Sequence, residues 1–309
     1  MRALVIGADG FAGRWLLRHL VDSGDEVIAG VGPRFSAPLP RDLAPLALNV
    51  RDEHQVRTVV REAQPEVIYY LAGVSAPDER GDVGHVFEVS VQGAQAALGA
   101  AVQQQPMPRV LLVGSSHVYG VRTIEHPVTE EETLRPTSIY GAMKAAAEVW
   151  AFGLGAATGL EVIAARPFNH IGPGQQPSFV ATSLAAQVAT IKASGMAGSV
   201  YVGSLDVKRD FTDVRDVVRA YRLLAEQGEP GEPYNIASGK STSIREILNG
   251  LIEIADIEAT VVTDEIRARP GEPPEIIGDA SKIRETAGWM PEIPLHQTLT
   301  DLLTQATTD

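Results

Sequence analysis

The strongest constraint on the fold is a regular alternation of short apolar runs with longer segments whose apolar residues have helical spacing. The segments 11–24 and 85–104, for example, carry apolar residues at helical intervals. Alternating strands and helices predict βαβ units, and apolar runs without polar alternation predict strands buried on both faces. We therefore expect an α/β fold with a doubly wound parallel sheet. The strand-length runs, each followed by Gly, Ser or Pro, are ALVIG (3–7), EVIAGV (26–31), EVIYYLAG (66–73), RVLLVGS (109–115) and EVIAARPF (161–168).

A glycine-rich turn, GADGFAG (7–13), lies between the first apolar run and the first helical segment. Its glycines follow the spacing G-x-x-G-x-x-G. Glycine permits a tight turn and lets a pyrophosphate approach backbone N–H groups at a helix N-terminus, where the helix dipole favours anions. An ordinary glycine-rich turn is the alternative, but at the first strand–helix junction of a βαβ chain the pattern predicts dinucleotide binding. The residues expected to contact the cofactor here are Gly7, Asp9, Gly10, Phe11 and Gly13.

The end of the second strand indicates which dinucleotide is bound. Sites that prefer NAD place Asp or Glu there to hold the ribose 2′-hydroxyl, whereas a nearby Arg can accept the 2′-phosphate of NADP. The segment AGVGPR (29–34) contains no acid and ends in Arg34. This predicts NADPH, with NADH as the alternative and a surface arginine as the non-functional interpretation. Further cofactor contacts are expected at the ends of the next two strands, from Asn49, Val50, Leu71, Ala72 and Gly73.

The segment SIYGAMK (138–144) contains Tyr140 and Lys144, which lie on one face of a helix because they are four residues apart. A lysine ammonium beside a phenol favours the phenolate and lowers its pKa towards the range of an acid–base catalyst. The spacing is common by chance, but here it accompanies a glycine turn and a serine after the fifth strand. We predict that Tyr140 and Lys144 form a catalytic pair that also contacts the cofactor.

Composition excludes several other classes of function. The chain has 309 residues, a net charge of −13 and no cysteine. The negative charge argues against a nucleic-acid partner, and the absence of cysteine excludes disulfides, thiolate nucleophiles and zinc–thiolate sites. No apolar stretch approaches a membrane span, so we expect a cytoplasmic enzyme with no membrane partner and no metal ion. Residues 1–168 should form a dinucleotide-binding Rossmann domain. Residues 169–309 should form mainly a substrate-binding lobe, with some segments returning to the Rossmann sheet.

The motifs together resemble the extended short-chain dehydrogenase/reductase family that acts on nucleotide sugars, over nearly the whole chain. Within that family they are most similar to the reductases of GDP-4-keto-6-deoxy-D-mannose, which form GDP-D-rhamnose. The stretches that carry the resemblance are GADGFAG, GSSHVYG (114–120), YGAMK, ARPFNHIGPGQ (165–175), RDFTDVRDVV (209–218) and RPGEPPEIIGDASKIRETAGWMP (269–291).

The resemblance implies that Ser115 is the catalytic serine, whose hydroxyl binds the C4 oxygen of the sugar beside Tyr140. Ser116 is expected to contact the substrate beside it, and a capping role at the strand end is the alternative for both serines. At the position of His117 the 4,6-dehydratases of the family carry Glu, which takes the C5 proton. His117 departs from that pattern, which favours a simpler reduction, with His117 either as a sugar contact or in a purely structural role. The family's epimerase–reductases pair a Cys with a His, and this chain has no Cys.

The resemblance also implies contacts beyond the catalytic centre. Pro167 should contact the cofactor, and Asn169 and Val180 should contact the substrate. Arg209, Arg269 and Glu272 are expected to hold the GDP diphosphate and ribose, since a guanidinium matches phosphate oxygens; surface salt bridges are the alternative for the two arginines. The helices at 85–104 and 138–158 form a dimer interface in the family, so a homodimer is expected.

The sequence thus predicts an NADPH-dependent reductase of a GDP-linked 4-keto-6-deoxy sugar. A nucleotide-sugar epimerase or 4,6-dehydratase with tightly bound NAD is the main alternative. A non-catalytic protein that senses the cofactor is a remote one, and the presence of both Tyr140 and Lys144 argues against it.

Overall fold

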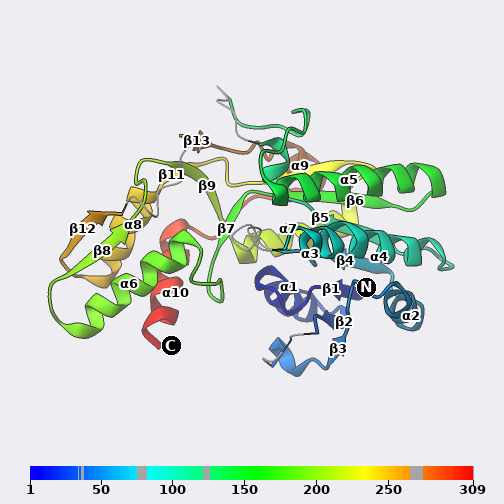
Figure 1. Cartoon of the computed structure of the whole chain (residues 1–309), viewed down its shortest axis with the longest axis horizontal. Helices are drawn as coiled ribbons and strands as arrows, with labels where there is room; N and C mark the ends of the chain where they lie inside the picture. Colours follow the sequence, from blue (N-terminus) through cyan, green and yellow to red (C-terminus); the bar gives the residue numbers. More distant parts are fainter. Residues whose placement is uncertain (34, 36–37, 75–81, 121–125, 265–273, 309) are drawn as a thin grey trace.

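The chain forms two parts, a large parallel sheet covered by helices on both faces and a smaller lobe (Figure 1). The structure is a computed structural model that describes all residues except 34, 36–37, 75–81, 121–125, 265–273 and 309. The N-terminus lies in the large part, and the C-terminal helix lies with the smaller lobe (Figure 1).

The large sheet has the strand order β10-β6-β5-β4-β1-β2-β3, and every neighbouring pair is parallel. This confirms the predicted fold class. The chain moves outward from β1 to β3 and then returns to build the other half from β4, so the strand order reverses between β1 and β4. Ligands of doubly wound sheets bind at the carboxyl ends of the strands around such a reversal. The strands are β1 (Arg2–Ile6), β2 (Glu26–Val31), β3 (Pro45–Ala47), β4 (Val67–Tyr70), β5 (Arg109–Val113), β6 (Val162–Pro167) and β10 (Pro233–Ile236).

Helices bury both faces of this sheet, as the uninterrupted apolar strands predict. In β1, Ala3 and Val5 enter one core while Leu4 and Ile6 enter the other, because successive side chains of a strand point to opposite faces. The first face is covered by α1 (Phe11–Asp22), α7 (Val214–Gln227) and α9 (Ser281–Ala287). The second face is covered by α2 (Glu53–Ala63), α4 (Gly93–Val102) and α5 (Ile139–Thr158), and α4 is preceded by α3 (Val83–Phe87) and the π-helical turn η3 (Glu88–Gln92).

The smaller lobe has its own core and two small sheets. Strand β9 (Lys208–Asp213) pairs with β7 (Asn169–Ile171), β11 (Ser241–Ser243) and β13 (Glu275–Ile276). Strand β8 (Gly198–Val202) pairs in parallel with β12 (Ala259–Thr263). The helices α6 (Val180–Ser194), α8 (Ile244–Ala255) and α10 (Leu295–Thr308) pack together in this lobe (Figure 1). The chain after residue 168 is shared between the two parts, since β10, α7 and α9 belong to the large one.

The described residues include no helix that is long and apolar enough to cross a membrane. Over the same residues, no group of three or more His, Asp and Glu side chains is placed to hold a metal ion.

Candidate active site

The glycine turn leaves bare backbone at the carboxyl end of β1. Gly7 has φ +90°, and a Cβ built on it would lie 2.7 Å from the backbone nitrogen of Ala72. A Cβ on Gly13 would lie 2.3 Å from the carbonyl oxygen of Gly7. Gly10 is the N-cap of α1 and makes no side-chain cap hydrogen bond, so the first N–H groups of α1 are not capped by Gly10. Main chain that excludes side chains, next to a helix N-terminus, fits a dinucleotide pyrophosphate.

The segments that follow β2, β3 and β4 lie around this turn. Asp9 Oδ1 accepts a hydrogen bond from the N–H of Gly32, which fixes the turn to the end of β2. The N–H groups of Leu71 and Ala72 both donate to the carbonyl of Ile6, so the segment after β4 lies directly beside β1. Asn49 follows β3, where its N–H donates to Gln55 Oε1. Arg34, the basis of the NADPH prediction, lies outside the described residues.

Tyr140 and Lys144 stand in the first turns of α5. Ser138 caps this helix by accepting a hydrogen bond from the N–H of Gly141. The Lys144 ammonium lies 5.9 Å from the centre of the Tyr140 ring and donates to the carbonyl of Val113, at the end of β5, over 2.8 Å. Burial lowers the pKa of Lys144 to about 8. A cation thus stands beside a partly exposed phenol, as the spacing predicts.

The cofactor turn and the catalytic helix meet at Gly73. A Cβ on Gly73 would lie 3.2 Å from Lys144 Nζ. Ala72, one residue earlier, is the residue that leaves no room for a side chain at Gly7. The structure therefore brings the predicted dinucleotide turn and the predicted catalytic lysine to the same point of the sheet.

The segment GSSHVYG forms a short 3-10 turn, η4 (Ser116–Tyr119), after β5. Ser115 is buried, and its Oγ accepts a hydrogen bond from the N–H of His117 over 3.2 Å. This is a capping role, but a hydroxyl that accepts one bond still has its own proton to donate. Capping and a catalytic role are therefore compatible for Ser115. Ser116 is partly exposed and begins the turn.

His117 lies against Tyr140. The two rings are 5.4 Å apart between centroids and meet edge to face, at 84°. The backbone of η4 also packs on the start of α5, because a Cβ on Gly141 would lie 2.5 Å from the carbonyl oxygen of His117. The exposed imidazole is thus beside the predicted catalytic phenol, although the two residues are far apart in sequence.

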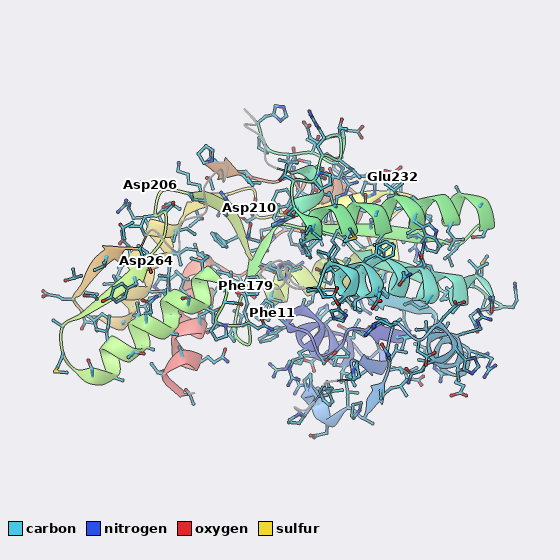
Figure 2. The ribbon with its side chains drawn as sticks, in the orientation of Figure 1. Phe11, Phe179, Asp206, Asp210, Glu232 and Asp264 are labelled. Carbon is cyan, nitrogen blue, oxygen red and sulfur yellow. The ribbon has the colours of Figure 1, made fainter. Side chains whose placement is uncertain are left out.

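A second histidine joins the cofactor turn to the smaller lobe. His170, on β7, stacks on Phe11 with ring centroids 5.8 Å apart and planes within 3°. Its Nδ1 lies 3.2 Å from the carbonyl of Phe168, and burial lowers its pKa. A carbonyl only accepts, so Nδ1 carries the proton and the neutral ring keeps Nε2 as an acceptor. Figure 2 shows Phe11 at the start of α1, where the large part faces the smaller lobe.

The remaining predicted substrate residues lie on the smaller lobe or beside it. Asn169 is exposed on β7, which pairs with β9. Arg209 is partly buried on β9 and donates to the carbonyl of Lys208. Val180 is exposed at the first position of α6, and Pro167 ends β6. Arg269 and Glu272 lie outside the described residues.

Asp210 and the acids that follow it support the fold. Asp210, labelled in Figure 2, accepts hydrogen bonds from the N–H groups of Ser238, Gly239 and Gly278 and from the Ser238 hydroxyl. Asp213 caps α7, and Asp216 accepts from the N–H groups of Glu292 and Ile293. Through these contacts Asp213 and Asp216 fix the start of α7 and the segment before α10.

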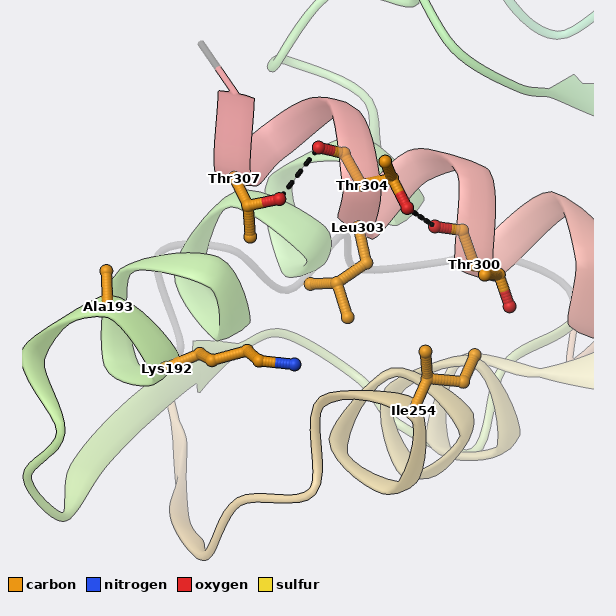
Figure 3. Close-up of a pocket in the computed structure, with 7 residues that line it drawn as sticks. All are labelled: Lys192, Ala193, Ile254, Thr300, Leu303, Thr304 and Thr307. Carbon is orange, nitrogen blue, oxygen red and sulfur yellow. Dashed lines mark hydrogen bonds between the residues drawn. The ribbon is translucent and has the colours of Figure 1, made fainter.

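A hollow of about 440 Å³ lies away from this centre, between α6, α8 and α10 (Figure 3). None of its lining residues is a predicted site residue. Its three threonine hydroxyls donate to carbonyls of their own helix, for example Thr304 to Thr300. The lining residues are Lys192, Ala193, Ile254, Thr300, Leu303, Thr304 and Thr307.

Comparisons with known proteins agree with this geometry. A family model described as GDP-mannose 4,6 dehydratase matches residues 4–302. The chain is 34% identical to the GDP-6-deoxy-D-mannose reductase of Pseudomonas aeruginosa, over 98% of this chain and 96% of that protein. The solved structure of RMD from Pseudomonas aeruginosa complexed with NADPH has a TM-score of 0.86 and 31% identity, with 99% of this chain and 98% of that chain covered. A putative epimerase from Burkholderia cenocepacia has a TM-score of 0.90 and 30% identity, with 100% and 98% covered.

Proposed function

The chain belongs to the GDP-mannose 4,6-dehydratase family of extended short-chain dehydrogenases/reductases, which act on nucleotide sugars, and from this premise we propose that it is a 4-ketoreductase. Its substrate would be GDP-4-keto-6-deoxy-D-mannose, its product GDP-D-rhamnose and its cofactor NADPH. The observation that carries the proposal is the juxtaposition of Ser115, Tyr140 and Lys144 beside the glycine turn.

Each of these three side chains has a defined task in a ketone reduction. Tyr140 gives a proton to the C4 oxygen as charge develops on it. The Lys144 ammonium, buried beside the phenol, stabilises the phenolate that remains. Ser115 donates its hydroxyl proton to the same C4 oxygen while its Oγ holds the N–H of His117.

The cofactor proposal rests on the fit of the glycine turn. Gly7, Gly10 and Gly13 would hold the pyrophosphate, and Gly73 would lie next to the reactive end of the cofactor, near Lys144. When bound, NADPH supplies the hydride that C4 accepts. The preference for NADPH is supported by the similar structure of RMD with NADPH, while the contribution of Arg34 remains a prediction.

The substrate proposal places the sugar between η4 and β7. Ser116, His117 and Asn169 would contact the sugar, and Arg209 would contact the diphosphate. Val180, Arg269 and Glu272 remain predictions for the nucleotide. The similarity to a GDP-6-deoxy-D-mannose reductase favours GDP over other nucleotides.

A homodimer is part of the proposal. The segments expected at the interface, 85–104 (the end of α3, η3 and α4) and 138–158 (α5), expose Phe87, Ile139 and Val149. Exposed apolar side chains grouped on neighbouring helices fit an association surface.

An epimerase or a 4,6-dehydratase with tightly bound NAD is the second candidate. The similarity to a putative epimerase and the match to a dehydratase family model favour it. His117 disfavours the dehydratase, because the resemblance places a glutamate at that position. The two candidates differ in their net consumption of cofactor, since only a reductase consumes one NADPH for each sugar.

The test is to follow NADPH oxidation by absorbance with GDP-4-keto-6-deoxy-D-mannose, with NADH and a dTDP-keto sugar as controls. Stoichiometric consumption only with the GDP sugar supports the proposal. An altered sugar without net consumption would instead assign an epimerase or dehydratase.

A tyrosine variant separates catalysis from cofactor sensing. Tyr140→Phe should lower kcat by roughly 10²- to 10⁴-fold, the usual contribution of a general acid, with a much smaller effect on NADPH binding because phenylalanine keeps the ring. The matched control is Tyr201→Phe, at an exposed tyrosine on β8, which should leave kcat unchanged. If wild type and both variants bind NADPH but none of them reduces the sugar, the sensor is supported instead.

A further inference from the structure

A buried ion pair lies behind the candidate active site. Arg166, on β6, donates from Nε and Nη2 to the two carboxylate oxygens of Glu148, on α5, over 3.1 and 2.5 Å. The exposed fractions of the two side chains are 5% and 1%. The pair is therefore out of contact with solvent, and it has no part in the chemistry described above.

The same guanidinium reaches the turn that carries Ser115. Arg166 Nη1 donates to the hydroxyl of Tyr119, the last residue of η4, over 2.8 Å. The Tyr119 hydroxyl in turn donates to Asn235 Oδ1, on β10, over 2.7 Å. Tyr119 and Asn235 are both buried, so one end of η4 is fixed to two strands of the sheet.

Glu148 fixes the helix that carries the proposed catalytic pair. It lies one turn after Lys144 and two turns after Tyr140, on the face of α5 that points to the sheet. Its carboxylate is also close to Gly114, where a Cβ would lie 3.4 Å from Glu148 Oε2. Arg166 is therefore bonded both to η4, which follows Ser115, and to α5, which carries Tyr140.

Stability alone is a weak explanation for this arrangement. Removing two charges from water opposes folding, and buried ion pairs can often be replaced by apolar residues without loss of stability. What a planar guanidinium supplies is direction, because its donors are held in a rigid fork. Here that fork holds Glu148 on one side and Tyr119 on the other.

We propose that Arg166 and Glu148 are positioning residues, which set the distance between the Ser115 hydroxyl and the Tyr140 hydroxyl. This inference rests on the proposed function of Ser115 and Tyr140. Neither Arg166 nor Glu148 touches the substrate in this proposal; they act through η4 and α5.

The experiment compares Arg166→Lys with Arg222→Lys. Lysine keeps the charge but cannot bond Glu148 in the bidentate manner and reach Tyr119 at once. Arg222 is a matched control, since it pairs with the buried Asp25 at the amino end of β2, whereas the candidate site lies at the carboxyl ends of the strands. Arg166→Lys should lower kcat roughly 10- to 100-fold, as expected for a small misplacement of reacting groups. KM and the NADPH dissociation constant should stay within about threefold, and Arg222→Lys should change none of the three.

Hydrogen exchange gives a readout that does not depend on the substrate. Peptides covering 114–120 and 138–145 should exchange faster in Arg166→Lys than in wild type, while peptides from α6 and α8 should not change. If wild type fails to reduce the sugar, the proposed function has failed, and this comparison still decides the positioning role. Unchanged exchange in both peptides would overturn the proposal.

A milder variant guards against misfolding. Tyr119→Phe removes only the hydroxyl that joins Arg166 to Asn235 and keeps the ring in place. It should lower kcat and raise exchange at 114–120, with no change at 138–145. Suppose instead that Tyr119→Phe raises exchange equally in all peptides, while kcat, calculated for the fraction of protein that binds NADPH, equals that of wild type. The network would then be merely structural.

Discussion

Lys144→Met should change how the stability of the protein depends on pH. Lys144 is buried, and its ammonium has the carbonyl of Val113 as a hydrogen-bond partner. Burial penalises the charged form, which lowers the pKa from 10.5 to about 8. Methionine is apolar, unbranched and of similar length, so it can occupy the same space without a titrating group.

The magnitude follows from the pKa shift. A fall from 10.5 to about 8 corresponds to a penalty of about 3 kcal/mol for the charged form in the folded chain. Below pH 8 the lysine is charged in the folded and the unfolded chain, so the full penalty is present. Between pH 8 and 10.5 the unfolded chain keeps its proton and the folded chain releases it, so the stability of wild type rises with pH. About 2 kcal/mol or more of that rise should appear between pH 7 and 10.

The variant lacks this rise. At pH 7 it is relieved of the penalty but loses the bond to Val113, which costs about 1.5 to 3 kcal/mol, so the two chains should be of similar stability. At pH 10 wild type should be the more stable by about 2 kcal/mol. The same substitution should abolish reduction at both pH values, because the cation beside Tyr140 is gone.

The assay is urea unfolding of the cofactor-free protein at pH 7, 8, 9 and 10. The quantity of interest is the difference in unfolding free energy between wild type and variant, in which the titration of all other groups cancels. Lys192→Met, at an exposed lysine of α6, makes the same chemical change away from the candidate site and is the control. A difference for Lys144→Met that stays constant from pH 7 to 10 would refute the inference that Lys144 is held charged against burial.

Two further predictions concern the cofactor turn and the histidine of η4. Gly13→Ala places a Cβ 2.3 Å from the carbonyl oxygen of Gly7, so the turn must open. The NADPH dissociation constant, measured by fluorescence titration, should therefore rise at least about tenfold. Unchanged affinity would show that the cofactor binds elsewhere. His117→Gln should keep the rate of NADPH oxidation within about tenfold of wild type, because one proton from Tyr140 suffices for reduction; a loss of roughly 10²-fold or more would give His117 an acid–base role.

The sequence predicts those parts of the fold and the site that depend on local patterns. Apolar runs without alternation indicate strands buried on both faces, and Ala3 to Ile6 indeed divide between two cores. Gly7 and Gly13 are recognisable because only glycine fits where backbones approach closely. Tyr140 and Lys144 are four residues apart, so helical geometry alone places them together.

Contacts between distant segments could not be predicted in this way. His170 meets Phe11 across 159 residues of chain, and Tyr119 meets Asn235 across 116. Such pairs depend on strand order and register, which no local pattern specifies. A weaker signal was present for Arg166, since a charged residue within the buried run VIAARP requires a partner. The sequence does not say that this partner is Glu148.

The two buried charges of α5 explain together why Tyr140 is held where it is. Lys144 and Glu148 lie one turn apart on an otherwise alanine-rich face, and each is bonded to a different strand, at Val113 of β5 and Arg166 of β6. A helix bonded to a sheet at one point can pivot about that point. A helix bonded at two points about 6 Å apart along its axis can neither pivot nor slide without leaving a buried charge unpaired, which is strongly unfavourable. Tyr140, one turn before the first of these bonds, is therefore fixed at the carboxyl edge of the sheet before any ligand arrives. Such preorganisation suits a site in which a single proton must reach one oxygen as the hydride reaches the adjacent carbon.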